Sequence, residues 1–301
     1  MKEAQFTIAA VERDVSLSKD VLRVWERRYG FPLPGRDSNG ERLYPAGQVL
    51  RLRLIKRLMD HGHRPGRLMA TSLKELEALA AGAPGTLSPA APRAGSEELD
   101  KLLVPIRQHD AAGYLQAMQQ RLARQGLRQF VQDTVAPLTV QVGLAWELGR
   151  LQIFEEHLFT ELTARVLRQA ISTVPGGSQP RVLMTTLPRE PHGMGLLMVE
   201  AVLSLEGAQC ISLGTQMPLP EIAGAAVAHR VDVVALSFSA AYPARQVAAG
   251  LEQLRAALSP TTGLWAGGSG VHRLAALEGV VCLASLDDAI AAVSERRTSR
   301  G

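Results

Sequence analysis

Val182-Leu183-Met184-Thr185-Thr186-Leu187, followed by Glu190-Pro191-His192-Gly193-Met194-Gly195, is the stretch that decides the fold of the second half of the chain. An apolar run with β-branched residues, a loop with glycines and a helical pattern predict a strand, a loop and a helix. Ligands of open α/β sheets bind at the carboxyl ends of strands, where this loop would lie. A carboxylate near a histidine can take one ring proton and leave the other nitrogen for a metal. The loop is a candidate ligand site. A surface loop with a solvated histidine would have the same sequence pattern and is the alternative.

The remainder of this half alternates between strand and helix patterns. Strands are predicted at 182–187, 210–213, 233–238, 264–266 and 280–283, and helices at 194–205, 219–229, 243–258, 271–276 and 287–296. This alternation predicts a doubly wound, flavodoxin-like parallel sheet. The segments with most functional promise follow four successive strands, and they are 190–195, 214–216, 237–239 and 267–270. All four are therefore expected on the carboxyl edge of the sheet, where a ligand would bind.

Residues 97–173 have helical periodicity almost throughout and predict a bundle of four antiparallel helices. Trp146 is separated by nine residues from the pair Glu156-His157. The break at Gly149-Arg150 places Trp146 near the end of one helix and the pair in the first turns of the next. We expect the three to cluster at one end of the bundle, with a core tryptophan and two surface polar residues as the alternative.

Residues 1–75 carry 15 Lys and Arg against 9 Asp and Glu, whereas the rest of the chain carries 18 against 20. A basic N-terminal module on a mildly acidic body indicates a nucleic-acid partner. Ser18 is placed to cap a helix over 19–29, whose spacing buries Val21, Leu22 and Trp25 and leaves arginines on other faces. A preceding amphipathic segment from Phe6 and a following hairpin at 36–44, with Asn-Gly at its tip, predict a winged helix-turn-helix.

The 301-residue chain has an ordinary composition for a soluble multidomain protein, with 46% hydrophobic and 21% charged residues. Cys210 and Cys282 both lie in apolar runs, which predicts buried thiols in a reducing, cytoplasmic setting. The sequence has neither a signal peptide pattern nor an apolar run of membrane-spanning length. Residues 80–96 are rich in Ala, Pro and Gly without periodicity, and they predict a flexible linker. The predicted domains are 1–79, 97–175 and 180–301.

The segment 22–30, Leu-Arg-Val-Trp-Glu-Arg-Arg-Tyr-Gly, followed by Pro34, Arg36, Gly40 and Arg42-Leu43-Tyr44, resembles the winged-helix domain of the MerR transcription regulators. The resemblance covers about residues 5–75 and implies binding to double-stranded operator DNA. The residues expected at the DNA are Arg23, Arg27, Arg28, Arg36, Arg42 and Tyr44. MerR regulators usually dimerise through a long helix after this domain, where the present chain has the predicted linker. Self-association is therefore expected in the C-terminal part, as a dimer or tetramer.

The C-terminal half resembles the cobalamin-binding module of methionine synthase and of light-responsive MerR regulators of the CarH/LitR type. The family pattern is Asp/Glu-x-His-x-x-Gly, then Ser-x-Leu, then Gly-Gly. Here it reads 190–195, Ser237-Phe238-Ser239 and Gly267-Gly268, and Trp146 with Glu156-His157 matches the additional motif of the light sensors. Ser239 departs from the leucine of the pattern, a small change in the wall of the nucleotide-tail pocket. Glu147 stands where some light sensors have a histidine that binds cobalt after photolysis.

The resemblance implies a set of residues around adenosylcobalamin. His192 would bind the cobalt from below, with Glu190 behind it, an arrangement that the chemistry also favours. The nucleotide tail would be accommodated by Gly195, Ser237, Gly267 and Gly268. The adenosyl group would be covered by Trp146, Glu156 and His157.

The sequence is therefore interpreted as a DNA-binding regulator, a repressor by resemblance, in which light breaks the cobalt–carbon bond and changes oligomeric state and DNA affinity. One alternative is a MerR regulator that keeps the cobalamin fold, binds no cofactor and responds to a protein partner. A remote alternative is a cobalamin-dependent mutase or methyltransferase, which the absence of a substrate barrel from the sequence disfavours. The sequence leaves three questions open. They are which genes are controlled, whether DNA binding represses or activates them, and whether the signal is light or cofactor level.

Overall fold

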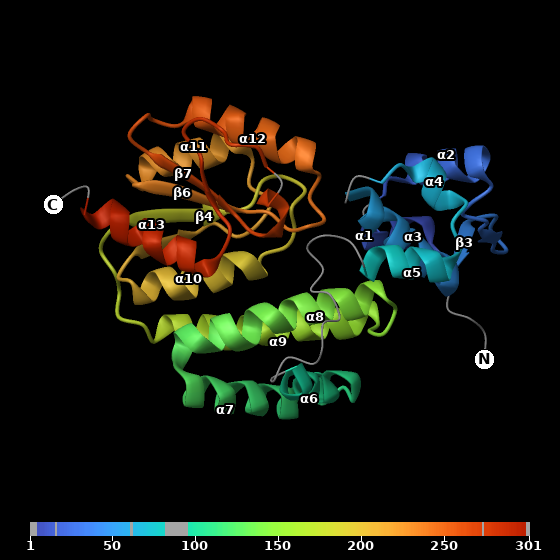
Figure 1. Cartoon of the computed structure of the whole chain (residues 1–301), viewed down its shortest axis with the longest axis horizontal. Coiled ribbons are helices and arrows are strands. Elements are labelled where there is room, and N and C mark those ends of the chain that lie inside the picture. Colours follow the sequence, from blue (N-terminus) through green and yellow to red (C-terminus); the bar gives the residue numbers. More distant parts are fainter. Residues whose placement is uncertain (1–4, 16, 61–62, 82–95, 273, 299–301) are drawn as a thin grey trace. The chain divides into compact units, whose positions relative to one another are not determined.

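The computed structural model describes residues 5–15, 17–60, 63–81, 96–272 and 274–298 (Figure 1). The chain divides into two compact units. The first comprises Met1–Lys101 and Val140–Glu156, and the second comprises Leu102–Thr139 and His157–Gly301. Most of the predicted linker, residues 82–95, lies outside the described residues. Among the described residues, no helix is both long enough and apolar enough to cross a membrane.

The N-terminal part of the first unit is a winged helix-turn-helix, as predicted. Its elements are β1 (Gln5–Thr7), α1 (Ile8–Val15), α2 (Lys19–Tyr29), β2 (Gly35–Arg36), β3 (Arg42–Pro45), α3 (Ala46–Asp60), α4 (Pro65–Met69) and α5 (Leu73–Ala81). The Ser18 hydroxyl accepts a hydrogen bond from the Val21 N–H at 3.3 Å, and this bond caps α2. At its other end α2 stops at Gly30, whose φ of 65° favours glycine.

The predicted hairpin is present and has a third strand. β2 and β3 pair antiparallel, and β1 pairs with the other side of β3, where Phe6 lies opposite Tyr44. Phe6 is turned towards the apolar core of the domain, whereas its neighbours Gln5 and Thr7 are exposed. This alternation is that of a strand, but three residues are too few for periodicity to reveal it. The amphipathic segment predicted from Phe6 is therefore a strand followed by a helix.

Four α-helices connected by short segments occupy the predicted bundle region. They are α6 (Ser96–Arg107), α7 (Ala111–Gln129), α8 (Ala136–Glu147) and α9 (Ile153–Ser172), with the π-helical turn η1 (Phe130–Val135) between α7 and α8. Gly126 interrupts the helical geometry of α7 with a φ of 73°. Within the second unit, α7 packs on α9. The Tyr114 ring meets the Phe159 ring edge-on at 6.1 Å, and the Tyr114 hydroxyl is hydrogen-bonded to the Thr163 hydroxyl at 2.7 Å.

The second unit also contains the predicted parallel sheet. Its strands are β4 (Arg181–Thr185), β5 (Gln209–Ser212), β6 (Val233–Ser237), β7 (Gly263–Gly267) and β8 (Val281–Leu283). All pairings are parallel, in the order β5-β4-β6-β7-β8. The first and third strands are thus neighbours, which makes the carboxyl ends of β4 and β6 the topological switch point of a flavodoxin-like sheet.

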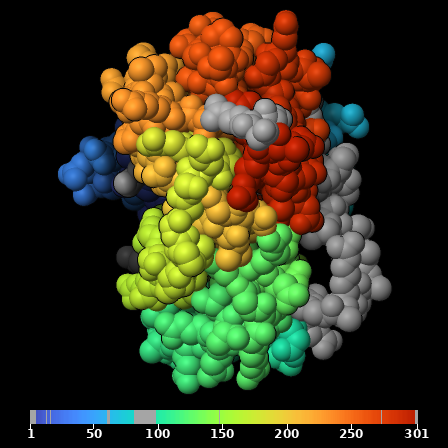
Figure 2. Space-filling view, turned by 90° about the vertical axis from the view of Figure 1, so that its left-hand side faces the viewer, coloured from blue at the N-terminus to red at the C-terminus, as the bar shows by residue number. Residues whose placement is uncertain are grey.

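Helices cover both faces of this sheet. They are α10 (Met194–Leu205), α11 (Leu219–Ala228), α12 (Ala244–Ala257) and α13 (Leu286–Thr298). Figure 1 shows α11 and α12 on one face and α10 and α13 on the other. Figure 2 shows α13 (red) beside the green segment of α7 and η1, where the Gln132 amide donates to the Asp287 carboxylate at 2.6 Å.

Two predictions for this unit are wrong. The helix expected at 271–276 is a short 3-10 turn, η2 (Ser269–Val271), followed by irregular chain at the described positions. The Gly270 N–H is held by the Phe238 carbonyl at 3.0 Å, which ties this segment to the end of β6 instead of a helix. Cys282 is exposed and Cys210 only partly buried, because they lie on β8 and β5, the two edge strands of the sheet.

Thr163→Val should destabilise the second unit, because the valine leaves the buried Tyr114 hydroxyl without its hydrogen-bond partner. The expected loss is about 1–3 kcal/mol, measured by urea unfolding followed by far-UV circular dichroism. Tyr114→Phe in the Thr163→Val background removes the orphaned hydroxyl as well, so the double variant should unfold at a higher urea concentration than Thr163→Val. A double variant that is less stable than Thr163→Val would show that the hydrogen bond is not what the two residues contribute.

Candidate functional site

The loop between β4 and α10 is folded back on itself and presents Glu190 inward and His192 outward. The Thr186 hydroxyl donates to the Glu190 carbonyl at 2.6 Å, and the Glu190 N–H donates to the Leu187 carbonyl at 3.1 Å. Arg189 completes the turn with a φ of 73°. As a result, the Glu190 side chain is only 1% exposed, whereas the His192 side chain is 56% exposed.

The Glu190 carboxylate joins the two loops of the switch point. Its Oε1 lies 2.6 Å from Nδ1 of His192 and accepts the His192 backbone N–H at 3.1 Å. Its Oε2 accepts the backbone N–H and the hydroxyl of Ser239 at 2.7 and 2.8 Å. Glu190 follows β4 and Ser239 follows β6, so one carboxylate holds the imidazole and both strand ends.

The hydrogen bonds decide the charge of this buried carboxyl group. Burial by itself would raise the pKa of Glu190, but the hydrogen bond and charge of His192 and the two bonds from Ser239 bring the pKa below its ordinary value. Glu190 is therefore ionised at neutral pH and can only accept. The proton of a neutral His192 then lies on Nδ1, which leaves the lone pair of Nε2 as the one able to bind a metal.

The loop after β5 is tied to the same place. The Thr186 hydroxyl that donates to Glu190 also accepts the Gln216 N–H at 2.8 Å. The Thr185 hydroxyl donates to the Gly214 carbonyl at 2.9 Å. The polar segments after β4, β5 and β6 are thus brought together at the carboxyl edge of the sheet, as their positions in the sequence predicted.

The structure also brings together the residues expected at the nucleotide tail. A Cβ on Gly195 would come within 2.6 Å of the Ser237 hydroxyl, and Ser237 is the register partner of Gly267 across β6 and β7. A Cβ on Gly268, which has a φ of 90°, would come within 2.4 Å of the Phe238 carbonyl. The close approach of these segments requires glycine at both positions.

Sequence reasoning missed two functional groups in this site. The sequence pattern indicates for Ser239 only a place in the wall of a nucleotide-tail pocket, and it does not reveal that the Ser239 N–H and hydroxyl donate to the Glu190 carboxylate behind the imidazole. The sequence pattern places Thr186 in an apolar strand, and in the structure its buried hydroxyl links the loops after β4 and β5. The available signal is a hydroxyl residue one or two positions after each strand, where a polar side chain can reach a neighbouring loop.

Trp146, Glu156 and His157 occupy the expected places along the helices. Trp146 lies in the last turn of α8, and the other two lie in the first turns of α9. Trp146 is stacked by Arg53 of α3, whose guanidinium carbon is 4.6 Å from the ring centroid. Clustering of Trp146 with Glu156 and His157 stays a prediction.

Three of the arginines expected at DNA are exposed on α2, and they are Arg23, Arg27 and Arg28. The other two lie on the hairpin strands. Arg36 is exposed and donates to the Gly40 carbonyl at 2.7 Å, whereas Arg42 is partly buried and donates to the Glu26 carboxylate at 2.9 Å.

The expected DNA contact of Tyr44 is contradicted by the structure. Its side chain is 0% exposed and lies in the core of the winged-helix domain, because the strand that carries it is paired on both sides.

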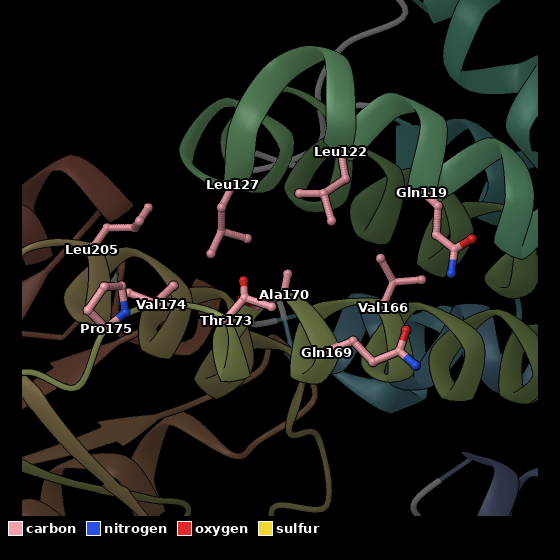
Figure 3. Close-up of a pocket in the computed structure, with 10 residues that line it drawn as sticks. All are labelled: Gln119, Leu122, Leu127, Val166, Gln169, Ala170, Thr173, Val174, Pro175 and Leu205. Atoms are coloured by element: carbon pink, nitrogen blue, oxygen red, sulfur yellow. The ribbon is translucent and has the colours of Figure 1, made fainter.

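A groove of about 510 Å³ lies between α7 and α9 and is distinct from the site at the sheet edge (Figure 3). Leu122 and Leu127 reach into it from α7, and Val166 and Ala170 face them from α9. Its lining contains no charged side chain. The groove is therefore a mainly apolar gap whose uncharged polar side chains are Gln119, Gln169 and Thr173.

Three parts of the chain match profiles of known families. Residues 6–68 match the MerR HTH family regulatory proteins, and residues 98–171 and 180–294 each match a B12 binding domain. Part of the chain is also similar in fold to the solved structure of the Methanosarcina barkeri monomethylamine corrinoid protein. That structure aligns with a TM-score of 0.53 at 16% identity over 67% of this chain and 99% of that chain, a likeness of fold alone.

Two repressors of Myxococcus xanthus are similar to most of the chain. The HTH-type transcriptional repressor CarH is 29% identical over 272 residues, 89% of this chain and 90% of the repressor. The HTH-type transcriptional repressor CarA is 30% identical over 257 residues, 84% of this chain and 83% of the repressor. The matches establish a DNA-binding, cobalamin-binding transcription regulator and not an enzyme. The chain belongs to the CarH-type MerR regulators, which combine a MerR helix-turn-helix with cobalamin-binding domains.

Proposed function

We propose that this regulator senses light through adenosylcobalamin and that His192 binds the cobalt from below. The observation that carries the proposal is the chain of hydrogen bonds from Ser239 through Glu190 to Nδ1 of His192. It fixes the imidazole in the tautomer that a metal requires, on a side chain that is accessible. A single protein imidazole suits a metal whose other ligands come mainly from a macrocycle.

The surrounding residues fit a corrinoid with a nucleotide tail. Gly195, Ser237, Gly267 and Gly268 lie together at the carboxyl edge of the sheet and carry little side-chain volume. By the resemblance, the nucleotide tail would lie along them. Glu190 would accept the Nδ1–H of His192 in a hydrogen bond, and Ser239 would hold the other carboxylate oxygen of Glu190. By the resemblance, Trp146, Glu156 and His157 are assigned to the adenosyl group.

Bound adenosylcobalamin would supply a cobalt–carbon bond that visible light breaks. The protein must convert the loss of the adenosyl group into a change at DNA. A ligand shifts an equilibrium only by its differential affinity for the two states. The intact cofactor must therefore favour the DNA-competent assembly, for which a dimer or tetramer formed by the C-terminal part is proposed. We also propose three functional domains in this assembly, joined in part by the linker 80–96. Their limits are 1–79, 97–175 and 180–301.

The direct test is the visible spectrum of the protein with adenosylcobalamin, together with its size by gel filtration, before and after illumination. We expect a bound-corrinoid spectrum in the dark, with a change of both spectrum and size after light. A corrinoid that stays bound without any light-dependent change in size or DNA affinity would argue for cofactor level as the signal. A protein that acquires no corrinoid absorption would be one that responds to another partner.

His192→Ala should weaken cobalamin binding and remove the spectral signature of the imidazole ligand, because no other side chain on this loop can replace it. The matched control is His229→Ala, an exposed histidine at the end of α11, just before the amino end of β6. Absorption spectra and equilibrium dialysis with adenosylcobalamin measure both effects. An unchanged spectrum in His192→Ala would remove this residue from the site.

Arg27→Gln should weaken operator binding and lower the slope of log affinity against log salt by about one unit, as expected for one phosphate contact. Arg42→Gln should have a smaller effect, because Arg42 already donates to Glu26. Arg230→Gln, which neutralises an exposed arginine of the second unit, is the control. Fluorescence anisotropy with labelled operator DNA at several salt concentrations makes the comparison, and equal slopes for Arg27→Gln and wild type would exclude the contact.

Glu147, the last residue of α8, stands where some relatives have a histidine that binds cobalt after photolysis. A carboxylate is a harder ligand than imidazole, so the illuminated wild type should release its corrinoid more readily than Glu147→His does. If His157 supplies a nitrogen instead, His157→Ala should accelerate the release. Gel filtration with absorption detection after illumination compares the three proteins. A stable bis-imidazole spectrum of wild type that survives His157→Ala would contradict both expectations.

A further inference from the structure

Trp146 is held by the DNA-binding part of the first unit through one side chain, Arg53 of α3. The Arg53 guanidinium lies over the indole ring at 4.6 Å, and its Nη1 donates to the Trp146 carbonyl at 3.3 Å. A planar guanidinium can stack on an aromatic ring while its edge makes hydrogen bonds, which an ammonium group cannot reproduce. Arg53 therefore fixes both the ring and the backbone of Trp146.

Arg53 is itself fixed by helix α1. Its Nε and Nη2 donate to one carboxylate oxygen of Asp14, at 3.1 and 2.9 Å. The side chains of Arg53 and Asp14 are 9% and 3% exposed, so neither can turn into solvent to find another partner. The same burial prevents Arg53 from serving as a DNA contact. Asp14 lies one turn before α2, the helix that carries the exposed arginines.

The corner after Trp146 packs on the same helix. Leu148 contacts the apolar core of the winged-helix domain. A Cβ on Gly149, which has a φ of 68°, would come within 3.1 Å of Leu50 of α3. Trp146, Leu148 and Gly149 thus all lie against the winged-helix domain, and Arg53 makes the hydrogen-bonded part of this contact.

We propose that Arg53 is a positioning residue that couples Trp146 to the DNA-binding helices. The inference rests on the proposed function, in which Trp146 covers the adenosyl group of the cofactor. A rearrangement of Trp146 on loss of that group would pull on the Arg53 guanidinium, and through Asp14 on the start of the helix-turn-helix. Linkage requires the reverse as well, so DNA binding should alter cofactor affinity by the same factor.

The test compares Arg53→Lys with Arg51→Lys. Arg51 lies on the same helix, stacks on Phe31 at 4.6 Å and donates to the carbonyls of Met69 and Thr71, all within the winged-helix domain. Both variants lose a stacked guanidinium and its hydrogen bonds. Only Arg53→Lys loses the contact with Trp146, so a general loss of stability affects both and a loss of coupling affects one.

The first measurement is acrylamide quenching of tryptophan fluorescence in the cofactor-free protein. Trp25 and Trp265 are buried, so the quenching reports mainly on the partly buried Trp146. Arg53→Lys should increase it, and Arg51→Lys should leave it unchanged. Equal quenching in Arg53→Lys and wild type would show that Arg53 does not hold the ring.

The second measurement is the ratio of operator affinities with and without adenosylcobalamin in the dark. Such couplings typically span 5- to 150-fold, and Arg53→Lys should reduce the wild-type ratio by at least about threefold. Its cofactor-free operator affinity should stay close to wild type. A ratio equal to that of wild type and Arg51→Lys would overturn the role of Arg53 alone. A wild-type protein that binds cofactor without any change in operator affinity would overturn the proposed function together with this inference.

Discussion

The site depends on one buried carboxylate. Glu190 is ionised at almost no exposure because four hydrogen bonds reach its two oxygens, from His192 on one side and Ser239 on the other. A buried charge is tolerated only when it is paired and hydrogen-bonded. The same bonds that keep Glu190 charged join the ends of β4 and β6, so the geometry of the switch point and the tautomer of the imidazole are set together.

Parallel-sheet topology explains why such an arrangement is possible. The order β5-β4-β6 places β4 between its two partners, and residues at the end of β4 can reach both neighbouring loops. Thr186 uses its hydroxyl towards the β5 loop, and Glu190 uses its carboxylate towards the β6 loop. β4 and β6 are largely buried and apolar, and the polar contacts between the loops come from residues that follow them.

Much of this could be predicted from the sequence, because strand and helix patterns are local. The limits of α10 and α2 follow from periodicity and capping. The position of His192 at the carboxyl edge of the sheet follows because loops after parallel strands meet at that edge. Tertiary facts could not be predicted. Tyr44 looks like a surface residue until β1 pairs beside it, and Ser239 looks like a pocket wall until its partner is known. The missing helix after Gly270 depends on a bond to Phe238, far away in the chain.

The close backbone packing around Gly268 and Gly270 has an evolutionary consequence. Added side chains there would collide with the carbonyls of Phe238 and Ser239, whatever the protein binds. Selection for folding alone would keep these glycines. The exposed imidazole of His192 is not needed for packing, so selection for folding would not keep it. A lineage that abandoned the metal would lose the histidine first and retain the glycines. Under the proposed function, retention of the glycines would indicate only that the fold is kept, whereas retention of His192 would indicate that the cofactor is still bound.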